Sequence, residues 1–431
     1  MSYVWNREKV EKLKKFIKIL RILELVEIIE EEEKLEKIRK RRKCWTRRWI
    51  MKRTNDLRST IPLAHNELCL EDTEYFNRFF RMREDLFDQL VDMVTPYIKR
   101  QDTQMRQSIT PRDRVFVTLR FLATGESYRS MEYSTRISAG TISQIIPETC
   151  RVIYTLLRKE YLKIPNTRDE WEKISNEFFR QWQFPNCLGA MDGRRITFKP
   201  PSKESSLYYN YKGTHSMVLL ALVDANYQFI YVDVGINGRD SDEGVLSESD
   251  IAPILVDPEN PLNIPSDKAL PGTDDVVPHV ILGDNAFPLQ KHLIKPYSTE
   301  HLTHEERIFN YRFSRGKRIV ENAIGILANR FRVMLVPMNL PVETVQTITL
   351  ACCALHNFFA KENAAYLCGT TDLEDSTNHT VTGGRWRDDN CEMSLLEPVN
   401  SRPEKIDLQN RDYFKQYFVG VGQVPWQDNM I

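Results

Sequence analysis

Three acidic residues occupy positions from which their carboxylates can meet. Asp192 follows the short apolar run at residues 188–191, and Asp284 follows a second run at residues 280–282. An apolar run that ends in an aspartate before a turn residue is typical of a strand with a carboxylate at its tip. Glu321 lies later, on a stripe of small and apolar residues with helical spacing. We expect two strand tips and one helix to bring three carboxylates together.

Three carboxylates suit divalent-metal chemistry on a phosphodiester. Breaking such a bond requires an activated water or hydroxyl and a stabilised leaving oxygen, and two metal ions about 3.5–4 Å apart supply both. Hard Mg²⁺ or Mn²⁺ ions prefer oxygen ligands to sulfur or nitrogen. We therefore expect Asp192 to bridge the two ions, Asp284 to hold one and Glu321 to hold the other.

Simpler roles for these acids remain open at this point. Glu321 shares its predicted helix face with small and apolar residues three, four and seven positions later, while Asn322 is predicted on the solvated face. A half-buried carboxylate is costly unless it is paired or bound to metal, so a salt bridge to Arg315 or Arg318 is the alternative. The two strand-tip aspartates are alternatively turn residues.

The elements around these acids predict an α/β layer. Apolar strands are expected at residues 216–223 and 227–235, followed by a helix that opens near residues 238–243. A proline-rich loop spans residues 253–278, before the Asp284 strand. The order strand, strand, strand, helix, strand, loop, helix suits an RNase H-like fold.

The preceding residues predict an all-α domain. Residues 71–165 carry apolar side chains near a 3.6-residue period, and Thr110 followed by Pro111 is a helix start. Residues 128–146 read as a helix, a short turn with a glycine and a second helix, which is helix-turn-helix spacing. A plain helical corner without a DNA-binding role is the alternative.

Composition excludes several protein classes. The chain has 431 residues, which allows two or three domains, and its mean hydropathy is −0.46. We expect no membrane span, because no run of about 18 apolar residues occurs, and no signal peptide. The eight cysteines include no CxxC pair, so we expect neither a disulfide framework nor a zinc knuckle. We therefore expect a reducing compartment, the nucleus or the cytoplasm.

Charge is unevenly distributed although the net charge is zero. Residues 37–58 hold eleven Lys or Arg and one acidic residue, whereas residues 369–431 hold eleven acidic residues and six basic ones. The predicted helix over residues 1–43 is either a solvated helix or, with this basic run, a nuclear-import or DNA-backbone patch. The predicted units are a charged N-terminal helix and basic patch (1–58), a helical domain (59–170), an RNase H-like nuclease domain (171–365) and a loosely structured acidic tail (366–431).

Six blocks, taken in order, resemble the PIF/Harbinger transposases, and more closely the domesticated Harbinger transposase-derived nucleases of animals. The blocks are residues 189–193 (GAMDG), 209–216 (YNYKGTHS), 238–242 (GRDSD), 283–289 (GDNAFPL), 320–332 (VENAIGILANRFR) and 355–357 (LHN). The resemblance spans about residues 71–360 and rests on six ordered blocks rather than one.

The resemblance implies a DDE triad at Asp192, Asp284 and Glu321, a divalent Mg²⁺ or Mn²⁺ cofactor, an RNase H-like fold and a DNA substrate. Asp242 matches a further acidic position of the family, which makes it a fourth metal ligand or, alternatively, a helix N-cap. The resemblance also implies a separate Myb/SANT-like DNA-binding partner that assists nuclear entry. A homo-oligomer stays open.

One departure from the family pattern divides the functional hypotheses. Arg194 and Arg195 follow the Asp-Gly pair, where relatives often carry Thr or Lys and then His. Two guanidinium groups there can contact DNA phosphates or compete with metal. We therefore expect a metal-dependent DNA endonuclease, with a DNA-binding or adaptor protein that has a silent nuclease core as the alternative. A glycosidase is rejected because its two acids do not explain the ordered blocks.

Overall fold

The computed structural model describes most of the chain. The described residues are Lys18 and 47–55, 59–104, 107–200, 208–210, 213–237, 246, 249–252, 262–298, 301–375, 377–388, 393–397 and 404–431. The chain divides into two compact units, Met1–Arg58 and Ser59–Ile431. In the first unit, α2 spans Arg48–Asn55. The helix predicted over residues 1–43 lies outside the described residues except for Lys18.

The second unit begins with helices. They are α3 (Thr60–Pro62), η1 (Leu63–Leu68), α4 (Cys69–Glu71), α5 (Thr73–Phe80), α6 (Glu84–Ile98), α7 (Pro111–Thr124), α8 (Tyr128–Thr135), α9 (Ala139–Leu157) and α10 (Arg168–Trp182). The predicted start of α7 is confirmed, because the Thr110 side chain accepts a hydrogen bond from the Asp113 backbone N–H and Pro111 takes the first turn. Gly125 ends the helix with a φ of 69°.

The predicted pair of helices joined by a short turn is confirmed in α8 and α9, but Gly140, predicted in the turn, lies in the first turn of α9. Three residues separate the two helices, Arg136 has a φ of 56°, and the Ser138 hydroxyl caps α9 by accepting from the Thr141 N–H. α9 packs along α14 (Val342–Glu362), a helix of the later part of the chain. The role of this segment in DNA binding stays a prediction.

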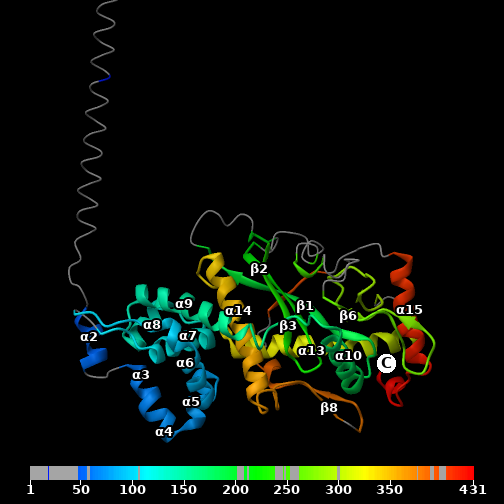
Figure 1. The fold of residues 1–431 in the computed structure, drawn as a ribbon, viewed down its shortest axis with the longest axis horizontal. Coiled ribbons are helices and arrows are strands. Elements are labelled where there is room, and N and C mark those ends of the chain that lie inside the picture. The colour runs from blue at the N-terminus through cyan, green and yellow to red at the C-terminus, as the bar shows by residue number, and fades with distance from the viewer. Residues whose placement is uncertain are drawn as a thin grey trace, which may run out of the picture. The chain divides into compact units, whose positions relative to one another are not determined.

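A six-stranded mixed sheet forms the centre of the second unit, so the fold is mixed α/β (Figure 1). Its strand order is β3-β2-β1-β6-β7, and β10 also pairs with β1. β1 pairs antiparallel with β2 and β2 with β3, whereas β1 with β6 and β6 with β7 are parallel. The strands are β1 (Cys187–Phe198), β2 (His215–Val223), β3 (Phe229–Asn237), β6 (Val280–Leu282), β7 (Leu293–Ile294) and β10 (Ser394–Leu395). The four predicted strands are all present.

Asp192 lies in the middle of β1 and not at its tip, which corrects the sequence prediction. β1 continues to Phe198, and Asp192 pairs with Ala221 of β2. Gly193 does not end the strand; it leaves room for Leu396, which a Cβ at this position would strike. On its other edge β1 pairs first with β6 and then, from Arg194, with β10. Asp192 therefore lies in the gap between these two neighbours.

Both faces of the sheet are covered. Alternate residues of β1 and β2, among them Ala190, Ile196 and Ala221, belong to the larger core, which includes α13 (His304–Arg330) and α14. The intervening residues, among them Met191, Val218 and Leu220, belong to a second core with Trp171 of α10. Figure 1 shows α13 and α14 beside the sheet. Burial on both faces explains why β2 reads as a continuous apolar run.

The prediction of a loose tail after residue 365 is wrong for the residues described there. α15 (Lys405–Val419) packs against α13 and buries Phe414 and Phe418. A two-stranded hairpin joins β8 (Leu373–Glu374) to β9 (Val381–Thr382), and η4 (Arg385–Arg387) follows. The buried residues of α15 do recur at helical spacing, but two of them, Asp407 and Asn410, are polar, so an apolar pattern alone does not reveal the helix.

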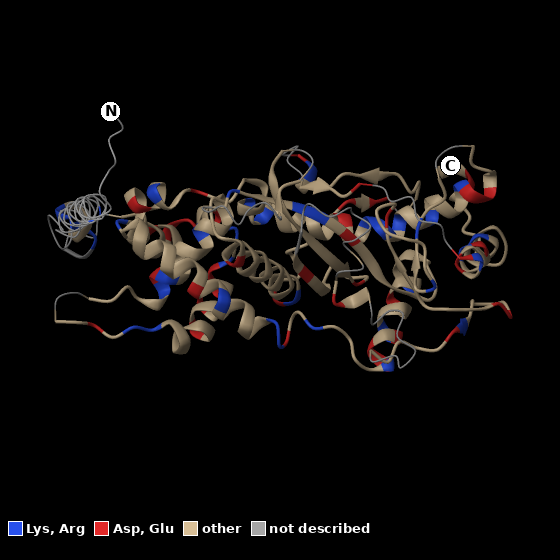
Figure 2. Ribbon diagram, turned by 90° about the horizontal axis from the view of Figure 1, so that it is seen from above, with Lys and Arg blue, Asp and Glu red and all other residues tan. Residues whose placement is uncertain are grey.

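The remaining described elements are short: β4 (Lys268–Ala269) pairs with β5 (Val276–Val277), η3 spans Arg332–Leu335 and η5 spans Gln427–Met430. No helix among the described residues is both long and apolar enough to cross a membrane. Basic and acidic residues are interspersed along the ribbon (Figure 2).

Candidate active site

The parallel pairing of β1 and β6 brings Asp192 and Asp284 to the same level. Ala190 of β1 is in register with Leu282 of β6, and each aspartate follows two residues later. Asp284 is also a turn residue, because its Oδ1 accepts a hydrogen bond of 2.9 Å from the Ala286 backbone N–H. Asp284 can therefore serve both roles: its Oδ1 stabilises the turn, and its Oδ2 faces the carboxylate cluster.

α13 supplies the third carboxylate and a lysine. Lys317 and Glu321 are four residues apart, so they share one helix face. The Lys317 Nζ lies 3.5 Å from Asp192 Oδ1, 3.8 Å from Asp284 Oδ2 and 3.9 Å from Glu321 Oε1. The structure thus brings together the three acids that the sequence predicts. It places the buried ammonium group of Lys317 between them. The cation that pairs with Glu321 is therefore Lys317, and not Arg315 or Arg318 as the salt-bridge alternative proposed.

Arg194 contacts the same cluster from β1. Its Nε donates a 2.9 Å hydrogen bond to Asp192 Oδ2, and its Nη1 donates to the Met393 carbonyl at 3.4 Å. Alternation along a strand explains this, since residues 192 and 194 point to one face. Arg195 is buried as well, only 4% exposed. Arg194 is therefore an ion-pair partner of Asp192 and not an exposed arginine.

The pKa values of the cluster reflect burial and charge together. Burial acts to raise the pKa of Asp192, but Lys317 and Arg194 outweigh it and hold that pKa below its ordinary value. Burial raises the pKa of Asp284 to about 6, with Lys317 opposing the shift and Asp192 adding to it. Burial acts to lower the pKa of Lys317, yet the three carboxylates keep it above its ordinary value.

The donor set fits a hard divalent cation, with one obstacle. Its oxygens are all carboxylate oxygens, and the site already accommodates a positive charge. Among the described residues, however, no three His, Cys, Asp or Glu side chains are grouped closely enough to hold a metal ion as they stand. The Lys317 ammonium occupies the space between the carboxylates and has to withdraw before a cation takes its place. Asp242, the predicted fourth ligand, lies outside the described residues.

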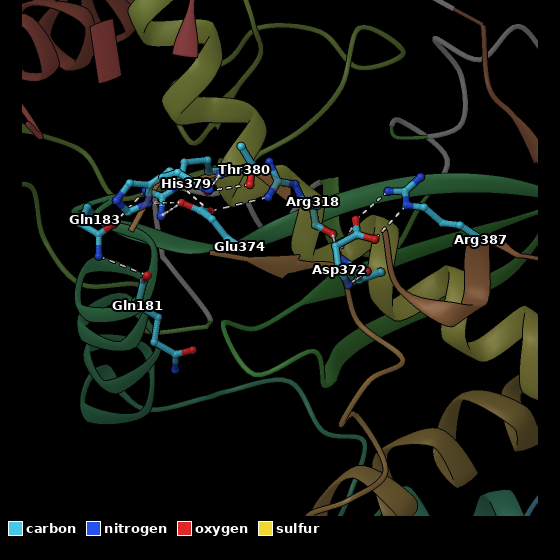
Figure 3. Close-up of polar contacts among 11 residues, drawn as sticks. Gln181, Gln183, Arg318, Asp372, Glu374, His379, Thr380 and Arg387 are labelled. Carbon is cyan, nitrogen blue, oxygen red and sulfur yellow. Dashed lines mark hydrogen bonds and ion pairs between the residues drawn. The ribbon is translucent and has the colours of Figure 1, made fainter. Parts of the chain in front are cut away.

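The two arginines considered as partners of Glu321 pair with another acid. Arg315 contacts Glu374 of β8 at 3.0 Å, and Arg318 contacts it at 3.7 Å. Figure 3 shows Glu374 between Arg318 and His379, and Asp372 facing Arg387. The hairpin after α14 is thus fastened to the helix that carries Lys317 and Glu321.

Asn322 is buried, which corrects its predicted place on a solvated face. It is 1% exposed, and its Oδ1 accepts a 2.7 Å hydrogen bond from Trp386 Nε1. The indole lies over Gly325, where a Cβ would strike the ring. Because Trp386 comes from η4, more than 60 residues later in the chain, helical periodicity does not reveal that this face is covered.

The block at residues 355–357 has a structural role. His356 is fully buried, with Nε2 2.9 Å from the Tyr227 carbonyl and Nδ1 2.9 Å from the Tyr366 hydroxyl. The Asn357 side chain hydrogen-bonds both the backbone N–H and the carbonyl of Phe229. These contacts fix α14 to the start of β3 and involve none of the three acids.

Comparison with known proteins gives a consistent set of relatives. Residues 191–357, which contain all three acids, match a family model described as DDE superfamily endonuclease. Protein ALP1-like of Arabidopsis thaliana is 28% identical over 71% of this chain and 73% of its own length. The rat putative nuclease HARBI1 is 24% identical over 66% of this chain and 77% of its own.

A second Arabidopsis thaliana relative, protein antagonist of like heterochromatin protein 1, is 25% identical over 66% of this chain and 73% of its own. No solved structure matches the chain significantly. The family resemblance inferred from the six blocks is therefore confirmed.

Proposed function

Because residues 191–357 form a DDE superfamily endonuclease domain related to the Harbinger transposase-derived nucleases, we propose that this protein is a divalent-metal-dependent DNA endonuclease of DDE transposase descent. One observation carries the proposal: a single cationic atom, Lys317 Nζ, lies within 4 Å of Asp192, Asp284 and Glu321. Three acids distant in sequence converge on one point, as ligands of a shared cation do.

Each residue of the cluster has a stated role in this proposal. Asp192, Asp284 and Glu321 would hold Mg²⁺ or Mn²⁺, which when bound activates a water or 3′-hydroxyl and stabilises the departing oxygen. Arg194 orients Asp192 through its 2.9 Å hydrogen bond. Lys317, once released from the carboxylates, would be free to donate hydrogen bonds to a phosphate oxygen of bound DNA.

The same proposal includes the fold type, a fourth metal ligand, a partner protein and the cellular compartment. The order of the antiparallel strands β3, β2 and β1 and the parallel strand β6 supports an RNase H-like fold for residues 171–365. The helical residues 59–170, predicted as a domain of their own, belong to the same compact unit. We also propose Asp242 as a fourth ligand, a Myb/SANT-like DNA-binding partner, and action in the nucleus as well as the cytoplasm.

Nicking of supercoiled plasmid DNA by the purified protein tests the proposal. The parent should nick with Mg²⁺ or Mn²⁺ and not with EDTA, and the Asp192→Asn, Glu321→Gln double variant should lose nicking by at least about 100-fold, as removal of transition-state charge stabilisation does. An Asp169→Asn, Glu160→Gln variant alters two exposed acids and serves as the control. Undiminished cleavage by the first variant, shown to be folded, would refute the triad.

A second function is favoured by the two cations already present. Lys317 and Arg194 satisfy much of the carboxylate charge without metal, so a silent nuclease core in a DNA-binding or adaptor protein is the alternative. One relative is named for antagonism of a heterochromatin protein rather than for cleavage. Tight DNA binding without measurable Mn²⁺ affinity would favour this alternative.

A further inference from the structure

A cavity of about 700 Å³ lies beside the far end of α13 and is lined by five arginines and a single acid. The arginines are Arg78, Arg81, Arg83, Arg330 and Arg385, and the acid is Glu74. They come from the α5–α6 junction, the end of α13 and η4, so three distant segments build one basic concavity. We propose that this cavity binds phosphates of the DNA backbone next to the cleavage site, a role that rests on the proposed function.

The charges of the cavity are only partly neutralised. Arg78 pairs with Glu74 on the exposed surface, and Arg83 pairs with Asp85 outside the cavity. Within the part of the chain that is described, no carboxylate forms an ion pair with Arg330 or Arg385. A concave surface with excess positive charge concentrates field lines and attracts anions. The excess of arginines is local to the cavity, since basic and acidic residues are interspersed along the ribbon as a whole (Figure 2).

Aromatic rings and backbone contacts hold the arginines in place. The Arg330 guanidinium lies 4.4 Å from the centre of the Tyr366 ring. This cation–π contact orients the guanidinium, and because the ring is uncharged it does not neutralise the positive charge. Arg81 donates a hydrogen bond to the Asn329 carbonyl across the cavity. Asp372 anchors the wall that carries Arg385, through two hydrogen bonds of 2.8–2.9 Å from Arg387 (Figure 3). Planar guanidinium groups fixed in this way suit phosphate oxygens.

One residue, Trp386, connects the cavity to the carboxylate cluster. Trp386 lines the cavity and also lines a small cavity of about 20 Å³ that reaches Glu321. Glu321 and Arg330 are nine positions apart on α13, which is about 14 Å along the helix axis at 1.5 Å per residue and places them on opposite sides of the helix at about 3.6 residues per turn. With about 3.4 Å per nucleotide on one strand, this distance corresponds to roughly four nucleotides. The cavity therefore suits DNA backbone a few nucleotides away from the cut phosphodiester, reached around the side of α13 that Trp386 covers.

The salt dependence of DNA binding tests the proposal. The probe is a 30-base-pair duplex, titrated in EDTA so that cleavage does not interfere. The Arg78→Gln, Arg385→Gln variant changes two exposed arginines of the cavity, and the control Arg168→Gln, Arg180→Gln changes two exposed arginines of α10. Losing two phosphate contacts should reduce the slope of log K against log salt by about 1.8, so from 50 to 200 mM salt the variant should lose about 12-fold less affinity than the parent.

The outcomes separate this proposal from the proposed nuclease function. A parental slope in the cavity variant overturns the cavity's role even if the parent nicks plasmid DNA. A reduced slope in that variant alone supports the cavity even if no plasmid is nicked. Because a free nucleotide offers the same phosphate chemistry, ATP is titrated as well. Saturable ATP binding that the variant loses, with an unchanged DNA slope, would assign the cavity to free nucleotides and overturn the DNA assignment.

Discussion

Replacing Lys317 by methionine should tighten Mn²⁺ binding. The ammonium lies 3.5, 3.8 and 3.9 Å from three carboxylates, and at an effective dielectric of about 20 each contact has a gross attraction of about 4–5 kcal/mol. Desolvation of the buried ammonium offsets most of this sum, and removal of one partner from a buried ion pair costs about 3–5 kcal/mol net. When Mn²⁺ must displace the ammonium, its binding free energy is less favourable by a similar amount, so the variant should bind about 100- to 4,000-fold tighter at about 1.4 kcal/mol per decade.

Calorimetric titration with Mn²⁺ and unfolding by urea measure both consequences. Without metal, Lys317→Met should be about 3 kcal/mol less stable than the parent, and Mn²⁺ at 100 times its Kd should restore about 2.7 kcal/mol. Lys291→Met is the control, because Lys291 pairs with an exposed aspartate at 3.4 Å; it should change neither quantity by more than about 1 kcal/mol. A folded Lys317→Met variant with unchanged or weaker Mn²⁺ affinity would refute the competition between lysine and metal.

Three further changes should be visible in urea unfolding. Gly325→Ala should cost about 1–3 kcal/mol because its Cβ strikes an indole ring, whereas Gly140→Ala, with nothing within 4 Å, should gain about 0.5–1 kcal/mol. Glu374→Gln should cost about 3 kcal/mol, since it leaves two arginines of α13 without their anion. Burial lowers the pKa of His356 to about 4, below its unfolded value near 6.5, so stability should fall by about 3 kcal/mol as pH drops through that window.

The last two predictions have matched controls. Glu160→Gln removes an exposed ion pair with Lys361 at 3.1 Å and should cost less than about 1 kcal/mol. His356→Gln should flatten the loss of stability between pH 6.5 and 4, whatever its effect at neutral pH, and the exposed His301→Gln should not. Equal pH slopes in the parent and His356→Gln would show that His356 is not the residue responsible.

The strands could be predicted from sequence because their signals are local, whereas the grouping of the three acids was indicated by the resemblance of six ordered blocks to a known family. An apolar run that ends at Asp284 specifies a strand and its turn within a few residues. The sequence predicts that β1 ends at Asp192, because a glycine such as Gly193 often follows the last residue of a strand. Its real role, making room for Leu396 from about 200 residues later, is a tertiary contact.

The centre of the candidate site could be predicted only in part. The four-residue spacing of Lys317 and Glu321 is visible in the sequence and places both on one helix face. That the same ammonium also meets Asp192 and Asp284 depends on the register of β1 with β6 and on how α13 crosses them. The cover that Trp386 provides over α13 is likewise set by packing between distant segments, and no local pattern encodes it.

The most direct test of the central claim exchanges one oxygen ligand for sulfur. Asp284→Cys should abolish plasmid nicking in Mg²⁺, because a thiolate is a poor ligand for this hard ion, and nicking should return in Mn²⁺ or Cd²⁺, which accept sulfur more readily. Parental protein should nick with Mg²⁺ in the same assay. Full activity of folded Asp284→Cys in Mg²⁺, or failure of every metal to restore it beside an active parent, would contradict a metal ligand at Asp284.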